Sequence, residues 1–83
     1  MAVQLILYTR TGCHLCEDMA QALAELAAGG TFTVSAIAID DDAELEQAYG
    51  ARVPVLMLAD RVICEYFLNP QALQQALSEH LDD

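Results

Sequence analysis

The apolar residues of this chain change their period several times, and these changes limit which elements it can form. Residues 3–8 (Val-Gln-Leu-Ile-Leu-Tyr) are a short run of β-forming residues. From Cys16 to Ala27, apolar residues recur every three or four positions, which is typical of one face of a helix. Two glycines at residues 29–30 are a helix stop signal. We therefore predict a strand at residues 3–8 and a helix at about residues 14–28.

Residues 32–39 have apolar side chains at both odd and even positions, which predicts a parallel strand covered on both sides. Three aspartates follow at residues 40–42, and one of them is expected to cap the next helix. Asp41 and Glu44 have capping-box spacing, and Gly50 is expected to end this helix.

The last third of the chain predicts a hairpin and a helix. Residues 53–58 form a strand opened by proline, residues 59–61 a tight connection, and residues 62–67 a fourth strand. Asn69 followed by Pro70 is a cap with proline at the first helical position, so a final helix begins there.

The predicted order is therefore βαβαββα. A right-handed βαβ crossover makes the first two strands parallel, and the hairpin adds an antiparallel pair. We predict an α/β thioredoxin-like fold class: a four-stranded mixed sheet with helices on both faces. At 83 residues and 55% hydrophobic composition, residues 1–83 are expected to form a single domain. Residues 1–8 lack the basic region of a secretory signal, so we expect a cytoplasmic protein.

The charge balance excludes some partners. Thirteen Asp and Glu face three Arg and no Lys, which gives a net charge of -10. Such a surface repels phosphate backbones and anionic membranes, so we expect neither nucleic acid nor membrane as a partner. An arginine near a cleft would then be the group that binds an anionic ligand.

The most informative motif is Cys13-His14-Leu15-Cys16, at the junction of the first strand and helix. A Cys-x-x-Cys beside a βαβ pattern favours a redox pair. At a helix N-terminus, the unpaired N–H groups and the dipole lower the pKa of a thiol below the free value of about 8.5, to roughly 3.5–7.5 in known sites. Arg10 adds positive charge nearby; for His14, a charged role and a plain exposed position stay equally open.

The cysteines allow two other interpretations. A structural disulfide between Cys13 and Cys16 would close a short ring worth only about 2 kcal/mol, against about 4 kcal/mol for a Cys13–Cys64 bridge. A zinc site of Cys13, Cys16, Cys64 and His80 lacks a matching second Cys-x-x-Cys pair. We prefer redox chemistry and expect no metal; Cys64 is expected to be a core residue.

Val53-Pro54 is the second signal, because proline at the start of an interior strand is unusual. A cis peptide there would make a tight turn, and an extended substrate could pair with the Val53 main chain. An ordinary trans proline at a strand entry fits the sequence as well.

Together these motifs resemble the thioredoxin fold and, more narrowly, the small bacterial glutaredoxin-like proteins. The resemblance rests on Tyr8-Thr9-Arg10-x-Gly12-Cys13-x-x-Cys16, Glu44-Leu45 with Tyr49-Gly50, and Arg52-Val53-Pro54-Val55-Leu56. It covers nearly the whole chain and includes a branch with Cys-His-Leu-Cys at the site.

The resemblance implies roles for five residues. Cys13 would be the nucleophile and Cys16 the resolving cysteine. Pro54 would be a cis-proline facing the site. Arg10 would lie near a glutathione carboxylate, and the Val53 backbone would pair with glutathione or a peptide.

One segment departs from the glutaredoxin pattern. Glutaredoxins hold glutathione with a Gly-Gly-x-Asp segment, where this chain has Ile63-Cys64-Glu65-Tyr66. This departure and the acidic surface argue against glutathione as the reductant, and we expect no bound cofactor.

We interpret the sequence as a thiol–disulfide oxidoreductase. A disulfide-bearing protein or small thiol would be its substrate and an unidentified reductant would restore it, with the chain acting as a monomer. The alternatives are a metal or iron–sulfur carrier, and a non-catalytic interaction module that uses acidic residues 40–46 as its partner surface.

Overall fold

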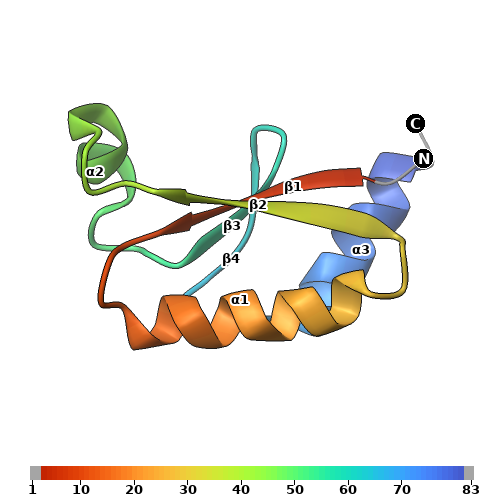
Figure 1. The fold of residues 1–83 in the computed structure, drawn as a ribbon. Coiled ribbons are helices and arrows are strands. Elements are labelled where there is room, and N and C mark those ends of the chain that lie inside the picture. Colours follow the sequence, from red (N-terminus) through yellow and green to blue (C-terminus); the bar gives the residue numbers. More distant parts are fainter. Residues whose placement is uncertain (1–2, 82–83) are drawn as a thin grey trace.

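The computed structural model describes residues 3–81, which form seven elements in the predicted order βαβαββα (Figure 1). They are β1 (Val3–Thr9), α1 (His14–Ala27), β2 (Phe32–Ala38), α2 (Ala43–Tyr49), β3 (Val55–Leu58), β4 (Arg61–Glu65) and α3 (Pro70–Leu81). No helix within this part of the chain combines the length and apolarity needed to cross a membrane.

The four strands form one mixed sheet in the order β2-β1-β3-β4. β1 is parallel to β2, with Val3 beside Phe32 at one end and Thr9 beside Ala38 at the other. β3 is antiparallel to both β1 and β4. The predicted crossover and hairpin are therefore confirmed.

Alternate side chains of β1 point to the same face of the sheet, and the hydrophobic core lies on that face. Val3, Leu5 and Leu7 are buried there, and the core continues into α1 and α3. The helical members of this core are Met19 and Leu23 of α1 and Leu73, Ala76 and Leu77 of α3. Figure 1 shows α1 and α3 on one side of the sheet and α2 on the other.

The opposite face meets α2 at one end only. Tyr8 of β1 stacks on Tyr49 of α2, with ring centroids 4.6 Å apart. Helices thus lie on both faces, as predicted. The expectation that residues 32–39 are covered on both sides is wrong, because residues 35–38 of β2 are all exposed, Ile37 among them at 37%. The seven residues of α2 are too few to reach along the strand.

The cap of α2 is Asp42, not Asp41. Its Oδ1 accepts hydrogen bonds from the N–H groups of Glu44 (3.0 Å) and Leu45 (3.1 Å). The predicted box between Asp41 and Glu44 is wrong because the helix begins at Ala43, one residue later than that spacing requires. At α3 the predicted cap is confirmed: Asn69 Oδ1 accepts from the Ala72 N–H at 3.1 Å.

The second hairpin strand is shorter than predicted. β4 ends at Glu65, whereas residues 62–67 were expected to be extended. Tyr66 has a φ of 66°, which is left-handed backbone and cannot continue a strand. Its N–H donates to the Pro54 carbonyl oxygen at 2.9 Å, so the end of β4 stays attached to the entry of β3.

Candidate redox site

Sheet topology brings the two sequence motifs to one end of the molecule. β1 and β3 are antiparallel neighbours, and Tyr8 lies beside Val55. The loop that leaves β1 leads to Cys13, and the loop that enters β3 contains Pro54. The end of one strand therefore meets the start of the other, and both motifs share that edge of the sheet.

Cys13 is the N-cap of α1. Its backbone is extended (φ -94°, ψ 109°), and its Sγ accepts a hydrogen bond from the Cys16 N–H at 3.1 Å. Gly12, with a φ of 78°, makes the preceding turn, which the Cys13 N–H closes on the Arg10 carbonyl oxygen at 3.3 Å. The Cys16 N–H and the positive end of the α1 dipole therefore meet at this sulfur.

Cys13 and Cys16 form a disulfide, with their Cα atoms 5.2 Å apart. The two residues differ in access to solvent. Cys16 is 3% exposed and belongs to the buried face of α1, whereas Cys13 is half-buried. An external thiol or disulfide can therefore reach Cys13 more readily than Cys16.

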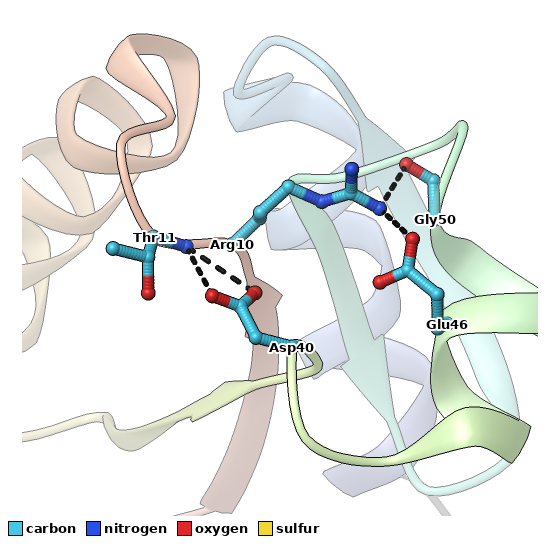
Figure 2. Close-up of polar contacts among 5 residues, drawn as sticks. All are labelled: Arg10, Thr11, Asp40, Glu46 and Gly50. Carbon is cyan, nitrogen blue, oxygen red and sulfur yellow. Dashed lines mark hydrogen bonds and ion pairs between the residues drawn. The ribbon is translucent and has the colours of Figure 1, made fainter.

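The Cys13 loop is attached to α2 and to the end of β2 by polar contacts (Figure 2). The Arg10 guanidinium donates to the Glu46 carboxylate and, at 3.1 Å, to the Gly50 carbonyl oxygen. The Thr11 N–H donates to Asp40 Oδ2 at 3.2 Å. Hydrogen bonding from Thr11, aided by the charge of Arg10, holds the pKa of Asp40 below its usual value. The anion that Arg10 binds here is thus a side chain of the same protein.

His14 lies beside the cysteines but points to solvent. Its side chain is 95% exposed, and its Nδ1 lies 3.8 Å from Glu17 Oε2. A charged role for His14 stays a prediction.

The Val53-Pro54 peptide bond is cis, which decides between the two possibilities that the sequence left open. Pro54 is buried and Val53 is half-buried. The Tyr66 hydroxyl donates to the Ala51 carbonyl oxygen at 2.7 Å, while the Tyr66 N–H binds the Pro54 carbonyl oxygen. The residue after β4 therefore holds the cis-proline loop at two points.

Arg52 adds a third attachment that the sequence reasoning missed. Its Nε donates to the Glu65 carboxylate, and its guanidinium lies over the Tyr49 ring, 5.4 Å from the centroid. Glu65, with desolvation opposing it, raises the pKa of Arg52. Its position directly before Val53-Pro54 was the available signal, but nothing local indicates a partner 13 residues away.

The residues of the alternative zinc site do not meet. Cys64 packs against the core from β4, and burial raises the pKa of its thiol. His80 lines a pocket with Arg61 and Glu79, at the end of β3 farthest from Pro54. Within residues 3–81, no group of three or more His, Cys, Asp or Glu side chains could hold a metal ion.

This sheet order, a cysteine pair at the start of α1 and a cis-proline before β3 define a redox-type protein of the thioredoxin fold. Thioredoxin 1 from Thermosipho africanus has the same fold, with a TM-score of 0.64 over 96% of each chain at 13% identity. The sequence matches the family described as Glutaredoxin-like domain (DUF836) over residues 4–78, and the chain belongs to that family.

Two solved structures are similar in sequence as well as in fold. A solution structure of a protein from Nitrosomonas europaea is 36% identical, covers 92% of each chain and has a TM-score of 0.80. An X-ray structure of a protein from X. campestris is 41% identical, covers 90% of this chain and 96% of its own, and has a TM-score of 0.71. A search of curated proteins finds no match.

Proposed function

We propose that this protein is a thiol–disulfide oxidoreductase with Cys13 as nucleophile and Cys16 as resolving cysteine. One observation carries the proposal: a half-buried sulfur caps α1 and is bonded to a second, buried sulfur one turn further along the helix. A pair made only for stability has no need of a helix N-terminus, whereas a nucleophilic thiolate does.

The reaction is two successive exchanges. In the reduced protein, the Cys13 thiolate attacks one sulfur of a substrate disulfide, forms a mixed disulfide and releases the other substrate sulfur as a thiolate. Cys16 then loses its proton and attacks Cys13 Sγ, which closes the Cys13–Cys16 disulfide and releases the second substrate sulfur. Two electrons pass to the substrate in total. The proton that Cys16 loses and one from solvent convert the two released thiolates to thiols, and a dithiol or two monothiols of a reductant return the two electrons.

The surroundings assist both exchanges. The N–H of Cys16 and the dipole of α1 favour negative charge on Cys13, both when it attacks and when it leaves. The main chain of Val53, held beside the site by the contacts of Arg52 and Tyr66, is the proposed pairing partner for an extended substrate.

Alkylation of the reduced protein tests the nucleophile. We expect the reaction of Cys13 with iodoacetamide, followed by mass spectrometry against pH, to give a pKa at least one unit below the free value of about 8.5. Cys64→Ser is the matched control and keeps disulfide reductase activity. Cys13→Ser abolishes reduction of insulin and of hydroxyethyl disulfide. A Cys13 pKa near the free value, with neither disulfide reduced, would overturn the proposal.

Removal of the resolving thiol tests the second exchange. Cys16→Ser is expected to accumulate a mixed disulfide on Cys13 that dithiothreitol releases, visible as a mass increase equal to the substrate thiol. The same variant with Cys13→Ser added should capture nothing. Capture by the double variant would show that Cys64 or another route is responsible.

The chain's own charges support a reductant other than glutathione. Each of the three arginines binds a glutamate: Arg10 to Glu46, Arg52 to Glu65 and Arg61 to Glu79. To bind any of these arginines, a carboxylate of glutathione would have to compete with the glutamate already paired to it. We expect turnover with dithiothreitol to exceed turnover with glutathione and glutathione reductase by at least tenfold at equal thiol concentration. Equal turnover with the two reductants would contradict this expectation.

A further inference from the structure

A pocket of about 270 Å³ lies beside the cysteine pair. Its lining consists of Leu15, Asp18 and Met19 of α1 and Tyr66, Phe67 and Leu68 of the segment after β4. Leu15 directly precedes Cys16 in α1, so one wall of the pocket comes from the same helical turn as the cysteine pair. Five of these six side chains are apolar or aromatic, and Asp18 carries the charge.

The rim of this pocket exposes large apolar groups. Phe67 is 70% exposed and Tyr66 is 44% exposed. The left-handed turn at Tyr66 and the bond from the Phe67 N–H to the Glu65 carbonyl oxygen, 2.7 Å long, set the direction of this segment. Exposed aromatic side chains beside a reactive group are typical of a contact surface rather than of a solvated loop.

The pocket is also fixed to the cis-proline loop. Tyr66 donates to the carbonyl oxygens of Ala51 and Pro54, so the aromatic rim and the Val53 main chain form one connected unit. Tyr66 is therefore the residue that connects this pocket to the loop whose Val53 main chain is the proposed pairing partner of a substrate.

The charges in and around the pocket favour one class of polypeptide. Asp18 lies in the pocket and Glu17 beside it is 73% exposed at the side chain. The arginines that flank the site, Arg10 and Arg52, are paired with glutamates, and the whole chain carries a net charge of -10. The field at the site therefore attracts cations and repels anions.

We propose that this pocket binds an apolar side chain adjacent to the cystine of a cationic polypeptide, and that such polypeptide disulfides are the substrate class. The inference rests on the proposed function and uses the same two exchanges. Apolar burial against Leu15, Met19 and Phe67 supplies affinity, and Asp18 favours a lysine or arginine next to it.

Four peptide disulfides separate the two contributions. They are homodimers of Ac-Yaa-Xaa-Cys-Xaa-Yaa-NH2, with Xaa either Leu or Gly and Yaa either Lys or Glu. Second-order rate constants for oxidation of the reduced protein are measured by rapid quench. We expect the Leu/Lys peptide to react at least tenfold faster than the Gly/Glu peptide, and 0.3 M NaCl to reduce the advantage of Lys over Glu.

Matched variants assign the contributions to residues. Phe67→Ala should lower the ratio of Leu to Gly rate constants at least threefold, and Asp18→Asn should lower the ratio of Lys to Glu rate constants. Leu26→Ala, a 46% exposed apolar residue at the far end of α1, and Asp60→Asn, in the turn between β3 and β4, should change neither ratio.

The outcomes distinguish the inference from the function beneath it. Similar rate constants for all four peptides, or faster reaction of the Glu or Gly peptides, overturn the pocket as a specificity site while reduction itself stands. If neither the peptides nor hydroxyethyl disulfide are reduced, the proposed oxidoreductase activity fails. A change with the Leu26 or Asp60 controls equal to that with Phe67 or Asp18 also overturns the assignment.

Discussion

The residues just before Cys13 are positioned by partners far away in the sequence. Arg10 binds Glu46 and Gly50 at the end of α2, and the Thr11 N–H binds Asp40 after β2. The place of Cys13 therefore depends on contacts that span about thirty to forty residues. The sequence predicted that Arg10 is important near the site, but its glutamate partner depends on tertiary contact and has no local signature.

The Asp40 contact has a defined pH dependence. Its folded pKa is lowered from 3.8, so the stability that it contributes is complete above that value and is lost as pH falls through the folded pKa. Asp40→Asn should therefore be less stable than the native chain at pH 7, and the difference should shrink below pH 3.8. Urea unfolding across this pH range measures it.

Asp41→Asn is the control for Asp40→Asn, because it removes the same charge without touching Thr11. Similar pH profiles for the two variants would show that the Thr11 contact contributes nothing.

At the scale of elements, α2 differs from the other two helices because none of its residues is buried. It is held by its cap at Asp42, by the stack of Tyr49 on Tyr8 and by the arginine contacts at its end. Periodicity predicted its existence because Leu45, Ala48 and Tyr49 recur on one face. Its cap could not be chosen among three adjacent aspartates, because each can accept the same hydrogen bonds.

Removal of the cap tests how α2 is held. Asp42→Ala should lower the free energy of unfolding by about 1 kcal/mol, the usual cost of losing an N-cap. Amide exchange in residues 43–49 should accelerate more than exchange in α1. Asp41→Ala is the matched control and should lose much less. If the two variants are equally destabilised, Asp42 is not the group that holds the helix.

At the scale of the whole molecule, the order of elements, the parallel pair β1–β2 and the antiparallel pair β3–β4 were predictable from the sequence, because periodicity and crossover handedness are local rules. The antiparallel pairing of β1 with β3 was not predicted. Coverage was not. The apolar pattern of residues 32–39 predicted a strand covered on both sides, yet β2 lies at the sheet edge with Ile37 exposed. Which strand is at the edge depends on the order of all four strands, and the cis state of Pro54 depends likewise on its neighbours.

The overall charge predicts a response to salt. A net charge of -10, with each arginine already paired, leaves the remaining carboxylates to repel one another in the compact state. Raising NaCl from about 10 mM to about 200 mM shortens the Debye length from about 30 Å to below 10 Å. We expect an increase in Tm of about 4–8 °C, which corresponds to about 1 kcal/mol in a domain of this size. Calorimetry at constant pH measures it; an unchanged or lower Tm would contradict it.

For the proposed reaction, the unequal exposure of the two cysteines has a consequence for the order of turnover. Since Cys16 is 3% exposed, we expect every electron pair of the proposed reaction to enter and leave through the Cys13 sulfur. Donor and acceptor must then occupy the same place in alternation and never together. Steady-state kinetics should accordingly give parallel double-reciprocal lines, and an excess of either reactant should compete with the other.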